Sequence, residues 1–148
     1  PVAFGFGFAL LGLAQWITRK SILKVDRSIL ILGAFYIGTL TAYVFFESYV
    51  INYRPVLIEG YLEASYPSST TLLVLCVMPT AMMQLRGRIK QPIFGKCVSI
   101  AITAFITFMV IGRLISGVHW LTDIIGGILL SAGLVMIYDS LIGGKIYE

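Results

Sequence analysis

Charged residues are scarce in this chain. They make up 12% of its 148 residues, whereas 58% are hydrophobic. Soluble globular domains have about a quarter charged residues, so the composition argues against a soluble protein. Histidine occurs once and cysteine twice, and Cys76 and Cys97 lie within or beside apolar runs without a framework spacing. A disulfide scaffold and a metal site are therefore not expected, and we predict no metal and no cofactor.

The apolar residues are concentrated in five runs, most of them long enough to cross a bilayer as a helix. A spanning helix needs about 20 apolar residues, and an open strand in lipid would leave its backbone groups unpaired. Gly126, Gly127 and Gly133 are expected to let neighbouring helices approach closely. We therefore predict an all-α fold, an integral membrane bundle of about five transmembrane helices, near 2–17, 28–50, 68–85, 96–115 and 119–141.

The net charge of +4 comes mostly from the loops between these runs, so we expect no nucleic-acid partner. By the positive-inside rule, short loops rich in Lys and Arg face the cytoplasm. This assigns the first loop, the third loop and the C-terminus with Lys145 to the cytoplasmic side, and loop 51–67 and the turn at 116–118 to the outer face. The basic residues of the two cytoplasmic loops are Arg19, Lys20, Lys24, Arg27, Arg86, Arg88, Lys90 and Lys96.

Polar side chains from three distant segments are predicted to meet at the outer face, and they suit an oxyanion with several negative charges. Arg54 and Arg113 each supply a planar fork of donors. The start of the third helix offers unpaired backbone N–H groups and the positive end of the helix dipole. Ser68, Ser69 and Thr70 add hydroxyl groups there. We therefore expect these five residues to bind a phosphate.

His119 and Asp123 are the candidate catalytic residues. They are four positions apart, so they share one face if both are helical. A carboxylate in this position can keep one imidazole nitrogen protonated and leave the other free to act as a base or nucleophile. Asp123 also lies in an apolar helix, where a carboxylate is costly unless it has a partner. The natural partners are His119 and an arginine.

Each of these features has a simpler explanation when it is taken alone. An arginine at a helix end can snorkel to the interface, and Pro-Ser-Ser-Thr is an ordinary helix start. His119 beside Trp120 could belong to an aromatic belt. The combination favours a functional site, because these explanations do not account for Asp123 or for the shared depth of all three segments.

The order and spacing of these residues resemble those of the type 2 phosphatidic acid phosphatase family of membrane lipid phosphatases. The resemblance implies one membrane-embedded lipid phosphatase-like domain over residues 1–148. Family members usually have six transmembrane helices, so the five predicted here correspond to the last five, and the first would be missing. The matching motifs are Arg54-Pro55, Pro67-Ser68-Ser69 and Arg113-x5-His119-x3-Asp123.

The resemblance also implies a mechanism. His119 would attack phosphorus and form a phosphohistidine, oriented by Asp123, while Arg54, Arg113 and the amides at 68–69 hold the phosphate. The implied substrates are lipid or isoprenoid phosphates of the phosphatidic acid, phosphatidylglycerophosphate or undecaprenyl diphosphate type. We expect a multi-pass protein of the bacterial cell membrane, surrounded by membrane lipids, with its site on the outer face. Oligomeric state is not encoded in these motifs.

The chain departs from the family pattern at three positions. The first motif normally begins with a lysine where this chain has Glu47, and the third normally opens with serine where it has Gly112. The second motif normally ends in a histidine that protonates the leaving oxygen, and here that position is Thr70. General acid–base help is worth about 10²–10⁴-fold, and a threonine hydroxyl is too weak an acid to supply it.

Two functions therefore stay open. One is a phosphatase that is slow or that uses a good leaving group such as a diphosphate. The alternative is a catalytically impaired family member that binds anionic lipid head groups or has a structural role. Retention of His119 and Asp123 favours the phosphatase, and loss of the general-acid histidine at position 70 favours the alternative. A channel or transporter is less consistent, because no polar path crosses the apolar runs.

Overall fold

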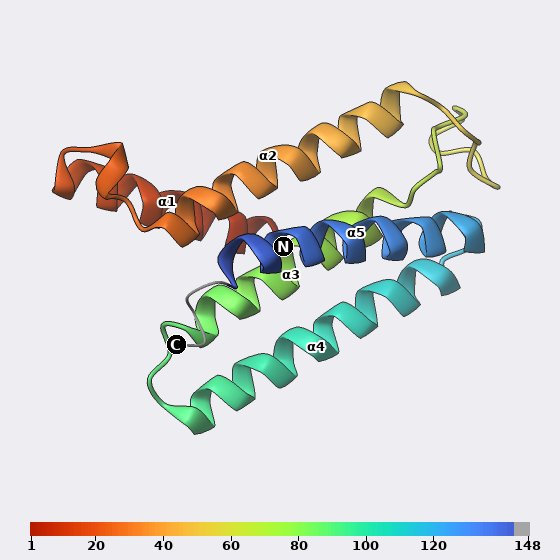
Figure 1. Cartoon of the computed structure of the whole chain (residues 1–148). Helices are drawn as coiled ribbons and strands as arrows, with labels where there is room; N and C mark the ends of the chain where they lie inside the picture. The colour runs from red at the N-terminus through yellow and green to blue at the C-terminus, as the bar shows by residue number, and fades with distance from the viewer. Residues whose placement is uncertain (144–148) are drawn as a thin grey trace.

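The computed structural model describes residues 1–143, which form a bundle of five α-helices (Figure 1). The predicted all-α class is confirmed. Lys145, predicted to lie on the cytoplasmic side, is outside the described residues. The helices are α1 (Val2–Arg19), α2 (Arg27–Ser48), α3 (Ser69–Arg86), α4 (Pro92–Ile115) and α5 (Leu121–Ile142), with a short 3-10 helix at Ile22–Lys24.

Two helix starts differ from the prediction by more than one residue. α4 begins at Pro92 rather than at residue 96, because proline suits the first helical position, where its missing N–H would be unpaired anyway. α5 begins at Leu121 rather than at residue 119, so His119 lies in the turn before the helix. The imidazole is therefore carried by a turn, and Asp123 by the first turn of the helix that follows it.

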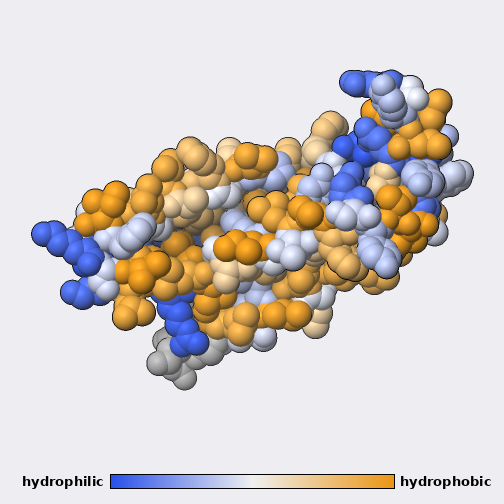
Figure 2. Space-filling view, turned by 90° about the horizontal axis from the view of Figure 1, so that it is seen from above, coloured by the Kyte–Doolittle hydropathy of each residue, from blue (hydrophilic) through white to orange (hydrophobic). Residues whose placement is uncertain are grey.

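Four of the helices, α1, α2, α4 and α5, are long and apolar enough to cross a membrane. Figure 2 shows hydrophobic side chains along the length of the bundle and hydrophilic ones gathered toward its two ends. The chain is therefore a multi-pass membrane protein. Its surface in the middle of the bundle matches the hydrocarbon core, and its ends match the polar interfaces.

α3 is as long as α1 but less apolar, because it is the helix most enclosed by protein. Its polar groups are paired inside the bundle: the Thr80 hydroxyl donates to the Cys76 carbonyl at 2.7 Å, and Gln84 donates to the Tyr138 hydroxyl at 2.6 Å. A helix that other helices cover can carry polar side chains that lipid would not tolerate. Its buried residues are Thr71, Leu72, Val74, Cys76, Met78, Thr80, Ala81 and Gln84.

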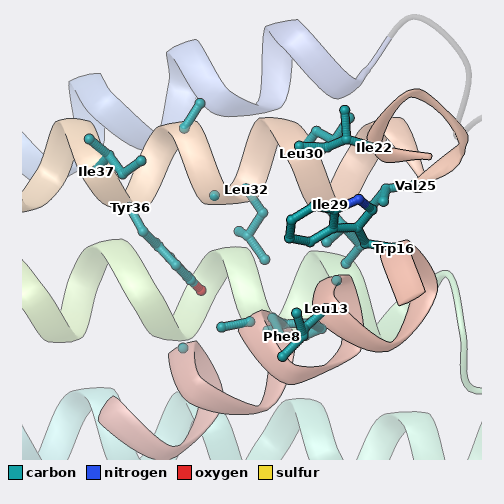
Figure 3. A pocket seen from close by; sticks show the side chains of 15 residues that line it. Phe8, Leu13, Trp16, Ile22, Val25, Ile29, Leu30, Leu32, Tyr36 and Ile37 are labelled. Atoms are coloured by element: carbon teal, nitrogen blue, oxygen red, sulfur yellow. The ribbon is translucent and has the colours of Figure 1, made fainter. Parts of the chain in front are cut away.

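α1 lies beside α2 and leaves an apolar groove of about 530 Å³ between them. Figure 3 shows Phe8 and Trp16 of α1 facing Ile29, Leu32 and Tyr36 of α2 across this groove. Leu32 continues into the core that joins α1 and α2 to α3 and α5. α1 and the first half of α2, which line the groove, lie toward the end of the bundle away from the loop between α2 and α3 (Figure 1).

The loop between α2 and α3 is a folded cap. At its tip, Glu59 and Gly60 both have positive φ angles, 50° and 85°, and Ile58 pairs with Tyr61, as expected for a hairpin turn. Along its two arms, the amide of Arg54 donates to the Glu63 carbonyl at 3.1 Å and the amide of Ser65 donates to the carbonyl of residue 52 at 3.0 Å. These bonds hold the two arms of the loop together, and the loop lies at the same end of the bundle as the α4–α5 turn (Figure 1).

Candidate active site

Asp123 is the centre of the polar cluster at this end. Its side chain is fully buried, and three donors surround it. Asn52 donates to Oδ1 at 3.0 Å, the backbone amide of Trp120 donates to Oδ2 at 2.9 Å, and the hydroxyl of Ser65 donates to Oδ2. The bond from Trp120 also caps α5, since a carboxylate at the third helical position accepts the amide of the N-cap. These bonds explain how a carboxylate is tolerated in this apolar helix.

His119 is held mainly by Ser65. The imidazole Nδ1 lies 3.1 Å from the Ser65 carbonyl oxygen and 3.2 Å from its hydroxyl, but 3.6 Å from Asp123 Oδ2. Because the carbonyl can only accept, these contacts assign the proton to Nδ1 and leave the lone pair on Nε2. Nε2 is buried and has no hydrogen-bond partner within residues 1–143. Asp123 therefore orients His119 chiefly through Ser65, because the Ser65 hydroxyl contacts both side chains.

Ser65 and Asn52 are site residues that the sequence did not single out. Ser65 is 2% exposed and makes contacts with both His119 and Asp123. The sequence around Ser65 hardly marks it as functional. It lies two residues before Pro67, in a loop whose conformation depends on tertiary contacts. Asn52 stands in a polar stretch after α2, and only its bond to Asp123 shows that it belongs to the site.

The two arginines of the cluster come from different elements, Arg54 from the loop between α2 and α3 and Arg113 from the last turn of α4. Arg113, at the end of α4, donates a hydrogen bond to the Thr70 hydroxyl in the first turn of α3. Arg54 is 14% exposed, and its Nε lies 3.2 Å from a carboxylate oxygen of Glu63, without hydrogen-bond geometry. Glu63 thus stands beside Arg54 as an ion-pair partner within the same loop.

Burial lowers the pKa of His119 from its ordinary value, and the positive charges of Arg54 and then Arg113 lower it further. The charge of Asp123 and the bond to the Ser65 carbonyl oppose this shift. Both guanidinium groups are therefore close enough to His119 to act on it electrostatically. The imidazole is neutral near pH 7, which is the form that can act as a nucleophile.

The start of α3 contributes backbone donors to the same place. The amide of Ser68 is already used, because it donates to the Asp123 carbonyl at 3.0 Å, and its hydroxyl accepts from Thr71 at 3.1 Å. The next amides, beginning with Ser69, have no acceptor inside the helix because they belong to its first turn. Ser69 lines a small pocket together with His119. Ser68 thus ties α3 to α5, while the following residues face the cluster.

Two glycines of α5 allow this arrangement. A Cβ atom at Gly126 would lie 2.3 Å from the ring of Tyr66, and one at Gly127 would lie 3.2 Å from the side chain of Thr71. The predicted close approach of a neighbouring helix is confirmed at Gly127, whereas the close neighbour of Gly126 is Tyr66 in the loop before α3. The prediction is wrong at Gly133, where a Cβ atom would meet nothing within 4 Å. The first turn of α3 and the loop before it therefore pack directly against the backbone of α5.

The contacts bring the predicted site residues to one end of the bundle, and the comparison with known families covers this region. The model of the PAP2 superfamily matches residues 38–142, from the middle of α2 to the end of α5. The match includes each of the predicted site residues and leaves out α1. No curated protein and no solved structure is significantly similar to the chain.

Proposed function

Because the chain belongs to the PAP2 superfamily, whose members act on phosphate esters, we propose that it is a membrane phosphatase with a histidine nucleophile. We propose as substrate a phosphomonoester or diphosphate of a lipid or an isoprenoid, of the phosphatidic acid, phosphatidylglycerophosphate or undecaprenyl diphosphate type. The observation that carries the proposal is the Nε2 atom of His119, which is buried, has no hydrogen-bond partner within residues 1–143 and lies within electrostatic reach of Arg54 and Arg113.

The proposed reaction has two steps. Nε2 of His119 attacks phosphorus, the bond from phosphorus to the leaving oxygen breaks, and a phosphohistidine forms. Water then attacks the phosphohistidine and releases phosphate. Arg54, Arg113 and the amides at the start of α3 stabilise the charge that develops on the phosphoryl oxygens, which is expected to be the main electrostatic contribution.

The orientation in the membrane is part of the proposal. The basic loops lie at the end of the bundle opposite the site (Figure 1), which supports a site on the outer face by the positive-inside rule, and we propose that the membrane is a bacterial cell membrane. The test uses purified protein in detergent with each of the three lipid types, and intact cells supplied with a short-chain phosphate that does not cross the membrane. We expect phosphate release in both, together with an acid-labile, base-stable phosphoenzyme. A phosphoenzyme of the opposite lability, or release only after lysis, would contradict the mechanism or the orientation.

The catalytically impaired alternative rests on Thr70. The structure places its hydroxyl against Arg113, where it accepts a hydrogen bond. In this position Thr70 can help to fix Arg113 but cannot protonate an alkoxide. A diphosphate needs less protonation of its leaving group than a monoester, so we propose that diphosphates are the better substrates.

Thr70→His is expected to raise turnover of a monoester by about tenfold or more, because an imidazole at this position can protonate the leaving oxygen. The gain should be smaller for a diphosphate, whose leaving group needs less help. Turnover of both substrates is measured between about pH 5 and 8. Thr70→Val is the control: it also removes the contact with Arg113 but adds no acid. Absence of a gain across this range would show that position 70 does not serve the leaving group.

The pH dependence follows from the lowered pKa of His119. A lower pKa means that the imidazole stays neutral to a lower pH, so kcat/KM should fall only as the pH drops below about 6.5, the ordinary value for histidine. The acid limb of the profile of kcat/KM against pH is measured, with a correction for the ionisation of the substrate itself. Replacing Arg113 with Gln removes one of the charges that lower the pKa, and should move the limb upward. A limb at or above 6.5 in the unaltered protein would contradict the assignment of His119 as the nucleophile.

A further inference from the structure

Ser65 carries a buried hydroxyl to which the proposed reaction assigns no role. The residue is 2% exposed and lies in the loop before α3. Its hydroxyl donates to Oδ2 of Asp123, and its oxygen lies 3.2 Å from Nδ1 of His119. Because a hydroxyl has a single proton, the proton given to the carboxylate leaves only lone pairs for the imidazole. The oxygen of Ser65 therefore accepts the Nδ1 proton, and the three side chains form a chain from carboxylate to hydroxyl to imidazole.

The carboxylate of Asp123 is held apart from the imidazole of His119. Oδ2 lies 3.6 Å from Nδ1, which is too long for a hydrogen bond. Asn52 donates to Oδ1 at 3.0 Å and the amide of Trp120 donates to Oδ2 at 2.9 Å. These two donors fix the carboxylate in its position, so the hydrogen-bonded connection from Asp123 to His119 runs through the hydroxyl of Ser65.

The backbone of Ser65 holds the residue in this position without help from the hydroxyl. Its amide donates to the carbonyl of Asn52 at 3.0 Å, across the two arms of the loop. Its carbonyl oxygen lies 3.1 Å from Nδ1 of His119 and is a second acceptor for the same proton. Removal of the hydroxyl alone should therefore leave the loop in place and the proton on Nδ1.

His119 becomes positively charged in the proposed first step. Nε2 forms a bond to phosphorus, and the leaving oxygen keeps the electron pair of the bond that breaks. The imidazole keeps its Nδ1 proton, so the ring becomes cationic. The positive charges of Arg54 and Arg113 oppose this, whereas the charge of Asp123 favours it. Glu47 borders the same small pocket as His119, but it is exposed and its charge is screened by water. Stabilisation of the cationic ring therefore depends on Asp123.

We propose that Ser65 is a positioning residue of the nucleophile, and that its hydroxyl transmits the stabilising effect of Asp123 to the cationic imidazole of His119. The proposal rests on the proposed phosphatase function and adds a residue on which the nucleophile depends. A hydroxyl that donates to a carboxylate is polarised by it, and its oxygen becomes a better acceptor. The proton stays on Nδ1 in both steps, and Ser65 itself forms no bond to phosphorus.

Ser65→Ala should lower kcat about 10- to 100-fold and leave KM nearly unchanged, because one hydrogen bond to a charged group is lost while the groups proposed to hold the phosphate are unaltered. Ser131→Ala is the matched control. Ser131 is a serine of α5 with the same degree of burial, and its hydroxyl donates to the carbonyl of Ile128 in its own helix. The control should keep full activity. An unchanged kcat in Ser65→Ala, or a loss confined to KM, overturns the proposal.

A double variant separates this role from a purely structural one. If the charge of Asp123 acts through Ser65, the hydroxyl has little further effect once that charge is gone. The kcat of the variant that combines Ser65→Ala with Asp123→Asn should therefore lie within about threefold of the kcat of Asp123→Asn alone. Independent roles would multiply the two losses, and that result overturns the proposal.

NMR can observe His119 directly, because it is the only histidine of the chain and isotope-labelled histidine gives the signals of this ring alone. In the unaltered protein in detergent, the neutral ring should carry its proton on Nδ1. Ser65→Ala should keep this tautomer and lower the pKa of the ring by about one unit, because the cation loses an acceptor. A proton on Nε2 in the unaltered protein overturns the proposal without any variant. A pKa that rises or stays constant in Ser65→Ala also overturns it.

The kinetic and NMR measurements separate the role of Ser65 from the phosphatase function. If the purified protein releases no phosphate but the tautomer and the titration of His119 are as expected, the phosphatase function fails and the electrostatic link through Ser65 stands. If phosphate release depends on His119 while Ser65→Ala changes neither kcat nor the pKa of the ring, the proposal for Ser65 fails alone.

Discussion

His119→Ala is expected to lower phosphate release by at least about 10⁴-fold while leaving the protein folded. The chain contains no second histidine that could take over as nucleophile. The fold should persist, because within residues 1–143 the imidazole has polar contacts with Ser65 and Asp123 alone, and those two residues remain bonded to each other in its absence. A large effect on rate with a small effect on stability is the signature of a nucleophile.

The measurement combines steady-state phosphate release with trapping of the phosphoenzyme and thermal unfolding in detergent. The trapped phosphate should disappear in His119→Ala, and the unfolding temperature should change little. Ser116→Ala is a suitable control, since it alters the same turn at a residue whose hydroxyl, within residues 1–143, bonds to the Arg113 carbonyl alone. Equal rates in His119→Ala and the unaltered protein would exclude the histidine mechanism. An unaltered protein that binds phosphate without turnover would support the impaired alternative.

Much of the fold was predictable, because lipid imposes a strong pattern on a sequence. Each helix that faces hydrocarbon must be long and apolar, so the runs that became α1, α2, α4 and α5 were visible from hydropathy alone. The start of α3 was indicated by Pro67 and the hydroxyl residues after it. The start of α4 was misplaced, since Lys96 was counted among the basic residues of the loop although Pro92 begins the helix.

The site was predictable only in part. The positions of Arg54, Arg113, His119 and Asp123 follow from motif spacing and from their shared depth in the membrane. The contacts among them do not, because they depend on the hairpin that places Ser65 beside the α4–α5 turn. The direct pair between His119 and Asp123 was expected from helical spacing. The structure instead has His119 in a turn, closer to Ser65 than to the carboxylate.

Asp123→Ala is expected to lose both activity and stability, in contrast to His119→Ala. The substitution leaves three donors facing a buried site without an acceptor: Asn52, Ser65 and the amide of Trp120. Buried donors without partners cost about 1–3 kcal/mol each, and partial relaxation of the loop reduces the sum, so we expect a loss of about 3 kcal/mol in unfolding free energy. Thermal unfolding in detergent measures this loss. Unchanged stability would show that the cap loop is held elsewhere.

Asp123→Asn separates the structural role of this residue from its electrostatic one. The Oδ1 atom of Asn52 has no partner within residues 1–143, so the Asn52 amide can rotate and accept from the new amide group at position 123. Most of the hydrogen bonds can then be retained, and stability should fall by only about 1 kcal/mol. The negative charge beside His119 is nevertheless lost, which lowers the pKa of the imidazole further and makes Nε2 a weaker nucleophile. Turnover should therefore fall far more than stability does. If both fell in proportion, Asp123 would act only by holding the cap loop in place.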